Sequence, residues 1–286
     1  MPFVKVRDVR LQYDLIGSPR TQDELETVVI TLGGRSGINA ARRLGSALAN
    51  RVPGIRVLLW DRRNTNCSGT KYDRTPLVSE DVDDLGALLD KLALSGTKKL
   101  ILYGCSSGSR VSLMFAVKWP QLVRGLVIAP PTGSDAIEEL CEMYYDAPSA
   151  LAKAKGLSVV AMDIFKDLSE EARSELANVP LDAFLISLEV TKQWMAQFKG
   201  QVLIGVTDYQ LKELAQESVK IVLVHDGNPN DKLHSTRAVL GLARLIRANK
   251  IYVQSGIFSL SNDVCIEIIN LLQKEFWPAK LDQSKI

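Results

Sequence analysis

The segment Leu100–Arg110 constrains the fold more than any other, because it passes from strand-like to helix-like sequence through a tight turn at a serine. An apolar run, Leu100–Tyr103, leads into Gly104-Cys105-Ser106-Ser107-Gly108, and a helical pattern follows. This is the spacing G-x-S-x-G in the strand–turn–helix context of a nucleophile elbow, where only small residues fit two places before and after the serine. We therefore expect Ser106 Oγ to stand clear of the sheet, beside a helix N-terminus that can stabilise an oxyanion.

The rest of the chain alternates between buried strands and amphipathic helices. A hairpin is predicted over residues 4–13, and apolar runs predict strands at 27–32, 55–60, 99–103, 122–128, 220–224 and 250–254. Helical spacing lies between them, at 38–51, 78–94, 107–118, 236–248 and 263–276. Short connections between alternating strands and helices imply right-handed crossovers, so we predict an α/β fold with a mostly parallel sheet and helices on both faces.

The alternation of strands and helices stops between residues 131 and 216, where the segments are helical or mixed and show no clear buried strand. We predict that 131–216 is an inserted helical lid over the elbow. The α/β core would then consist of residues 1–130 and 217–286. Such a lid would roof Ser106 and shape an apolar pocket.

Composition excludes several function classes. The net charge is +2 and the basic residues are scattered, which gives nucleic-acid binding no electrostatic support. No apolar stretch approaches the roughly 20 residues that span a bilayer, and the N-terminus has no signal-peptide pattern. The four cysteines form no C-x-x-C, so we expect neither a metal site nor a cofactor, and a reduced intracellular compartment.

A glycine-rich loop, Gly33-Gly34-Arg35-Ser36-Gly37, ends the strand at 27–32. The loop lacks the G-x-G-x-x-G spacing and the P-loop lysine, which argues against a phosphate cradle. In a chain with a nucleophile elbow, such a loop donates an N–H group to the oxyanion. We predict that the oxyanion hole is formed by the N–H groups of Gly34 and Ser107.

The motifs together resemble the α/β-hydrolase fold superfamily, over essentially the whole chain and in the family's order. They are the Gly-Gly loop, the D-R-R turn at 61–63, G-x-S-x-G, a late lid, and V-H-D-G-N-x-x-D-x-x-H at 224–234. The resemblance implies that Ser106 is the nucleophile and Asp231 the acid. The family's histidine lies in the loop after the last strand, where this sequence has Gly256-Ile257.

Ile257 cannot remove a proton from a serine hydroxyl, which is a weak nucleophile without a base. We therefore predict a degenerate triad that lacks the usual histidine. His225 and His234 are the two histidines of the chain and the candidate replacement bases. Relatives often carry locally packing histidines at both positions, so we interpret both as structural unless one comes within about 3 Å of Ser106 Oγ. A lid carboxylate or tyrosine, or Asp231 acting through water, are further candidates.

The chain ends in Ser284-Lys285-Ile286, which resembles the S-K-L peroxisomal address. With the fold, the length and the missing histidine, this ending resembles the peroxisomal hydrolase-like enzymes of fungal host-selective toxin clusters of the AK-toxin type, which build an epoxy-decatrienoic acid. The resemblance implies an apolar acyl or polyketide substrate, including an acyl-CoA, an import receptor as partner, and peroxisomal localisation. Without that address the expected location is the cytoplasm.

Three functions remain open at this stage. The first is a hydrolase or acyl-transfer enzyme, an esterase or thioesterase in which Ser106 attacks a carbonyl. The second is a non-hydrolytic isomerase, dehydratase or epoxide-processing enzyme, which the missing histidine motivates. The third is an inactive ligand-binding protein, although a binder does not require an elbow.

Overall fold

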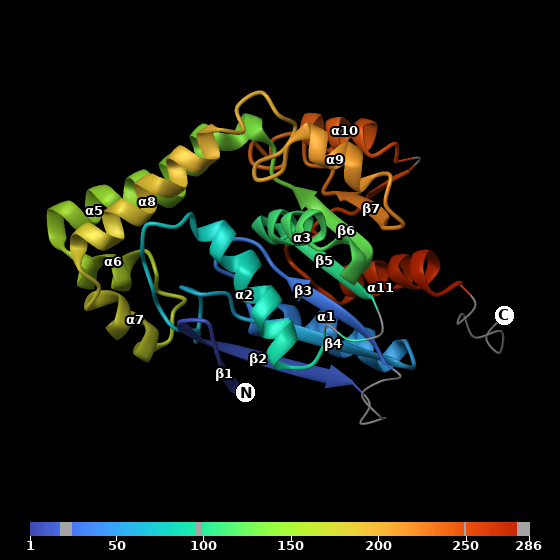
Figure 1. Ribbon diagram of the computed structural model, residues 1–286, viewed down its shortest axis with the longest axis horizontal. Coiled ribbons are helices and arrows are strands. Elements are labelled where there is room, and N and C mark those ends of the chain that lie inside the picture. The colour runs from blue at the N-terminus through green and yellow to red at the C-terminus, as the bar shows by residue number, and fades with distance from the viewer. Residues whose placement is uncertain (18–24, 95, 97–98, 249, 279–286) are drawn as a thin grey trace.

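A computed structural model describes residues 1–17, 25–94, 96, 99–248 and 250–278 of the chain. Ser284-Lys285-Ile286 lies outside the described residues. The described strands form an eight-stranded sheet in the order β1-β2-β4-β3-β5-β6-β7-β8 (Figure 1). They are β1 (Phe3–Val6), β2 (Val9–Gly17), β3 (Glu26–Thr31), β4 (Ile55–Trp60), β5 (Leu100–Ser106), β6 (Val123–Pro131), β7 (Lys220–His225) and β8 (Ile251–Val253).

The sheet is parallel from β4 to β8, and β2 pairs antiparallel with both β1 and β4. All six residues of β4 are buried, as are the first six of β5. Continuous apolar runs of this kind are expected for strands that are covered on both faces.

Two layers of helices cover the sheet. Helices α1 (Ile38–Arg51) and α11 (Asn262–Phe276) pack together on one face, around buried side chains such as Leu44 and Ile269. Helices α2 (Leu77–Lys91), α3 (Ser107–Lys118) and α10 (Thr236–Leu245) bury the other face, around Leu85 and Phe115. The predicted mostly parallel sheet with helices on both faces is confirmed. Within the described residues, no helix combines the length and apolar character needed to cross a membrane.

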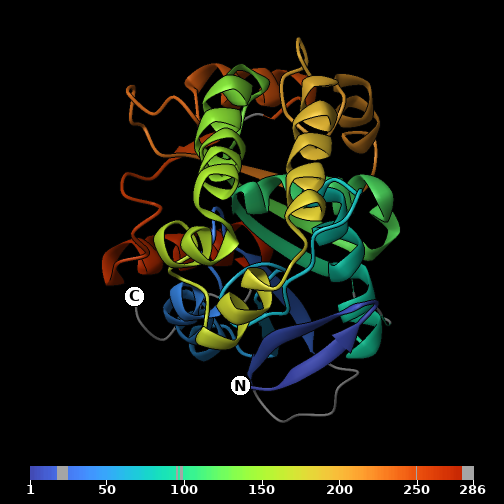
Figure 2. The same ribbon diagram turned by 90° about the vertical axis from the view of Figure 1, so that its left-hand side faces the viewer.

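Between β6 and β7 the described chain is mainly helical. The elements are η3 (Ser134–Ala136), α4 (Ile137–Cys141), the π-helical turn η4 (Glu142–Asp146), α5 (Ala147–Lys155), α6 (Leu157–Asp163), α7 (Glu170–Ala177), α8 (Leu181–Ala196) and α9 (Asp208–Leu214). A short η2 (Pro120–Leu122) precedes β6. We call α4 to α8 the lid helices. They stand at one end of the sheet and hide part of it in Figure 2.

The lid helices have their own apolar cluster, which includes the fully buried Phe184 of α8 and Leu176 of α7. Helix α9 instead packs against α3 and α10, and its Leu211 and Leu214 join the apolar core of the sheet. The boundaries of the insertion, 131 and 216, stay a prediction. Helix α9 lies within these boundaries but packs with the core.

Candidate active site

Ser106 lies at the junction of β5 and α3 with a φ of +55°, in the left-handed region that costs energy for a residue other than glycine. The flanking glycines make this turn possible. A Cβ on Gly104 would lie 2.5 Å from the Gly108 carbonyl oxygen, and one on Gly108 would lie 2.0 Å from the Thr31 oxygen. The neighbouring Cys105 is not a competing nucleophile, because burial raises the pKa of its thiol to about 12.

His234 joins the serine to a carboxylate. Its Nε2 lies 2.8 Å from Ser106 Oγ, and its Nδ1 lies 2.8 Å from Asp231 Oδ2. Hydrogen bonds on both ring nitrogens fix the orientation of the imidazole, and the carboxylate favours the tautomer with the proton on Nδ1. The serine, histidine and aspartate therefore form one hydrogen-bonded chain.

The fold of the loop after β7 brings His234 to this position. Asp231 Oδ1 accepts hydrogen bonds from the backbone N–H groups of Leu233, at 2.9 Å, and His234, at 3.1 Å. Such a turn directs the chain back over the carboxylate, so a residue three places later can reach it. Burial lowers the pKa of His234 below its ordinary value, although the Asp231 carboxylate acts in the opposite direction. The imidazole is therefore neutral near pH 7 and able to accept a proton.

These contacts correct the interpretation of His234 as a residue that only packs locally. Ile257 does occupy the loop after β8, where it is fully buried, and the ring of the next residue, Phe258, lies 4.8 Å from the imidazole. Ser106 therefore does have a histidine partner, but at another place in the sequence than the family resemblance implies. His225 is buried elsewhere, and its Nδ1 accepts a hydrogen bond from Gly227 at 3.0 Å.

The Gly33-Gly34 loop lies against the serine. A Cβ on Gly33 would come within 2.9 Å of Ser106 Oγ, and Gly34 has a φ of +56°. Among the described residues, the N–H group of Gly34 has no hydrogen-bond acceptor. The N–H group of Ser107, at the first position of α3, has no acceptor within the helix. Arg62 donates to the Gly34 carbonyl oxygen and holds the loop in place. Gly34 and Ser107, the predicted oxyanion donors, line the same cavity as Ser106.

The D-R-R turn is a buried polar support for the site. Asp61 accepts a hydrogen bond from the Ile38 N–H at 2.8 Å, at the start of α1, and Arg62 pairs with Asp81 at 3.1 Å. The third residue, Arg63, bonds to a carboxylate of α2 at 2.7 Å. These contacts agree with the structural interpretation of the turn.

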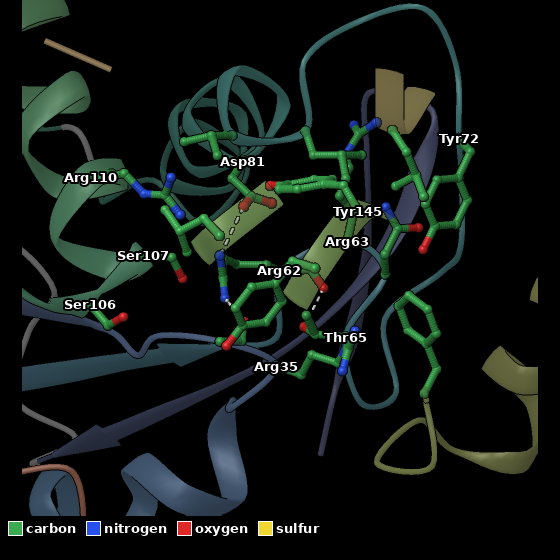
Figure 3. Close-up of a pocket in the computed structure, with 18 of the residues that line it drawn as sticks. Arg35, Arg62, Arg63, Thr65, Tyr72, Asp81, Ser106, Ser107, Arg110 and Tyr145 are labelled. Carbon is green, nitrogen blue, oxygen red and sulfur yellow. Dashed lines mark hydrogen bonds and ion pairs between the residues drawn. The ribbon is translucent and has the colours of Figure 1, made fainter. Parts of the chain in front are cut away.

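Two cavities meet at Ser106. The inner cavity, about 120 Å³ in volume, lies between the core and the lid helices, which contribute Leu140, Tyr144, Tyr145 and Leu188 (Figure 3). An outer cavity of about 360 Å³ lies on the side of His234 and Phe258. The inner wall carries charged residues that the sequence did not identify as pocket residues: Arg35, Arg110 and Asp81, together with Arg62 and Arg63 of the D-R-R turn.

Comparison with known proteins identifies the fold. No protein-family model matches the chain, and neither does any curated protein sequence. An enol-lactonase from Burkholderia xenovorans is 13% identical with a TM-score of 0.65, over 95% of this chain and 100% of the other. A carboxylesterase from the thaumarchaeon Nitrososphaera gargenis is 14% identical with a TM-score of 0.66, over 96% and 98%. A thermophilic esterase from Thermogutta terrifontis is 17% identical with a TM-score of 0.61, over 96% and 99%. The chain therefore has the α/β-hydrolase fold.

Proposed function

We propose that the protein is a serine hydrolase that cleaves an ester or thioester of a small acyl substrate. One observation carries the proposal. His234 Nε2 lies 2.8 Å from Ser106 Oγ, while Nδ1 of the same ring lies 2.8 Å from Asp231 Oδ2. A neutral imidazole in this geometry is the base that a serine hydroxyl needs. The esterases and the enol-lactonase among the structural neighbours support a hydrolase of this kind.

The reaction takes place in two stages. Ser106 Oγ attacks the carbonyl carbon while its proton passes to His234 Nε2, and the electron pair of the carbonyl bond moves to the oxygen. The N–H groups of Gly34 and Ser107 stabilise this oxyanion. As the tetrahedral species collapses, the bond to the leaving group breaks and the leaving group takes the proton from His234.

Hydrolysis of the acyl-enzyme completes the cycle. A water molecule gives a proton to His234 and attacks the acyl carbon, and the Oγ–C bond then breaks as Ser106 regains a proton. The two cavities suit the two halves of the substrate. The inner cavity would hold the acyl group, and the outer cavity beside His234 would hold the leaving group and the attacking water.

The hydrogen bond between the Ser106 hydroxyl and His234 Nε2 also weakens the two other candidate functions. A non-hydrolytic isomerase or dehydratase was motivated by the absence of a histidine base, and an inactive binder by the loss of the chemistry. Neither argument applies when a buried histidine is hydrogen-bonded to both Ser106 and Asp231. His234 thus replaces the histidine that relatives carry at the position of Ile257.

The biological setting is proposed on the resemblance of the sequence alone. We infer a role in fungal toxin biosynthesis, with an apolar acyl or polyketide intermediate, including an acyl-CoA, as substrate. Ser284-Lys285-Ile286 would bind the peroxisomal import receptor. Removal of these three residues from a fluorescently tagged protein should change punctate to diffuse fluorescence, and unchanged puncta would refute peroxisomal delivery by this signal.

A fluorophosphonate probe tests the chemistry directly, because it reacts with an activated serine without any knowledge of the substrate. We expect covalent labelling of the wild-type protein and none of Ser106→Ala. The absence of labelling in a folded wild-type protein would contradict the proposal. Equal labelling of Ser106→Ala would show that another residue reacts.

A further inference from the structure

Among the described residues, Arg110 is a buried cation with no ion pair of its own: Asp81, whose carboxylate acts on its charge, is paired with Arg62. It lies in the first half of α3, is only 5% exposed, and lines the inner cavity together with Ser106. Its Nε has no hydrogen-bond partner, and Nη1 contacts the sulfur of Met195 at 3.9 Å. Within the described part of the chain, no carboxylate lies at ion-pair distance from its guanidinium. Figure 3 shows the side chain extending from α3 into the pocket.

Such an arrangement is costly for a protein on its own. A guanidinium remains protonated even though burial lowers the pKa of Arg110, so it cannot avoid the cost by losing its charge. A buried charge normally has a partner, because removing it from water costs several kcal/mol per ion. An unpaired guanidinium beside a nucleophile is therefore best explained by an anion that arrives with the substrate.

The neighbouring groups point to the same kind of ligand. The Oγ of Ser107 is buried, lines the same cavity and also has no hydrogen-bond partner. Four arginines and one aspartate line the cavity. Of these, Arg62 is paired with Asp81, and Arg63 with Glu80 and Asp84.

The fourth arginine, Arg35, stacks over Phe165 with its guanidinium carbon 4.2 Å from the ring centre, and donates to the Ile164 oxygen. Its charge has no described acidic partner and adds to the positive potential of the wall. The paired arginines contribute little net charge, so Arg110 and Arg35 leave the cavity electropositive.

We propose that the inner cavity binds a carboxylate carried by the acyl half of the substrate, with the Arg110 guanidinium as its receptor. This inference rests on the proposed hydrolase function, because it names the substrate class of that site. Arg110 follows Ser106 by one turn of helix, about 5.4 Å along the axis, and helical side chains lean back toward the N-terminus. A carboxylate bound there lies a short chain away from the carbonyl carbon at Ser106. The preferred substrates are half-esters or half-thioesters of short dicarboxylic acids.

A matched pair of esters tests this specificity. Mono-4-nitrophenyl glutarate and 4-nitrophenyl valerate have the same number of acyl carbons and differ in the terminal carboxylate. We expect the wild-type kcat/KM to be at least about tenfold higher for the glutarate, after subtraction of its spontaneous reaction, since a charge-assisted contact contributes about that factor. In Arg110→Met the ratio should fall to near one. A wild-type ratio near one, or an unchanged ratio in Arg110→Met, would overturn the inference.

A control variant and a binding measurement make the result unambiguous. Arg237→Met makes the same change at an exposed position outside the inner cavity and should keep the wild-type ratio. Arg110→Met should not lower the melting temperature, because it removes an unpaired buried charge, so a folding defect can be recognised. Glutarate binding to Ser106→Ala, measured by calorimetry, should be lost in the double variant with Arg110→Met.

Because Ser106→Ala cannot turn over, the binding measurement separates the two proposals. Arg110-dependent glutarate binding without turnover of either ester by the wild type would refute the hydrolase and leave the carboxylate site standing. Turnover of both esters at equal rates, without glutarate binding, would refute the carboxylate site and leave the hydrolase standing.

Discussion

At the scale of single residues, the chemistry depends on the protonation of His234. The ring can accept the Ser106 proton only when Nε2 is free, and the Asp231 carboxylate keeps the single proton of the neutral ring on Nδ1. Burial within the loop opposes protonation of the ring more strongly than the carboxylate favours it. The environment thus tunes the base toward the state that catalysis requires.

This environment predicts the pH dependence of the reaction. The value of kcat/KM for a neutral ester should be constant near pH 7 and should fall as the pH decreases through the His234 pKa. Because burial lowers this pKa from 6.5, the midpoint should lie below pH 6.5. Initial rates over a pH series with constant ionic strength measure it, and a midpoint above 6.5 would contradict the burial argument.

At the scale of elements, the junction of β5 and α3 is positioned by close backbone contacts. Gly33→Ala should disrupt it, because the new Cβ would lie 2.3 Å from Ser106 Cβ and 2.8 Å from the Cys105 oxygen. We expect the free energy of unfolding to fall by about 1–3 kcal/mol, as in other overpacked sites. Gly96→Ala is the control, since its Cβ would meet none of the described atoms within 4 Å, its chain neighbours aside. Equal stability of the two variants in urea would argue against this close packing.

The turn after β4 is anchored on α2 by buried charges. Asp84 is fully buried and accepts from Arg63, whose side chain is 2% exposed, at 2.7 Å. Asp84→Ala would leave Arg63 paired with Glu80 but with unsatisfied buried N–H groups, and should lower the free energy of unfolding by about 1–3 kcal/mol.

The adjacent Asp83 provides the matched control. It pairs with Lys118 on the surface, with side chains 38% and 51% exposed, so Asp83→Ala should cost less than about 1 kcal/mol. Chemical denaturation of both variants compares them. A loss for Asp84→Ala no larger than that for Asp83→Ala would show that the buried pair does not stabilise the fold.

The sequence predicted elements better than it predicted contacts between them. The elbow around Ser106 was predictable because its spacing and flanking patterns are local. The contact of Ser106 with His234 spans 128 residues and depends on how one loop folds back on Asp231. The family resemblance places the catalytic histidine in the loop of Ile257, so it offered no reason to expect this contact of His234. The sequence places Arg110 four residues after Ser106, in the helix that follows the elbow, but it does not show that the guanidinium of Arg110 is buried without an ion-pair partner among the residues described.

At the scale of the whole molecule, the inner cavity lies between the core and the lid helices, which contribute part of its wall. Its volume of about 120 Å³ is smaller than a cavity of about 150 Å³ that holds benzene, so we expect it to accommodate an acyl group of about four to six carbons. Among 4-nitrophenyl esters from acetate to decanoate, kcat/KM should be highest in that range.

Leu188→Ala, in the wall formed by α8, should move this optimum to longer chains because it enlarges the cavity. The melting temperature of the variant shows whether the lid remains folded. A wild-type rate that rises steadily to decanoate would show that a cavity of this volume does not limit the length of the acyl chain.

The central claim, that His234 activates Ser106, is tested most directly by comparing the two histidines of the chain. His234→Gln should lower kcat by about 10⁴-fold or more, because a glutamine cannot take the serine proton. His225→Gln should keep activity within about tenfold of the wild type, since His225 hydrogen-bonds to Gly227 and not to Ser106. Activity of folded His234→Gln close to the wild-type value, or equal losses in both variants, would contradict the account.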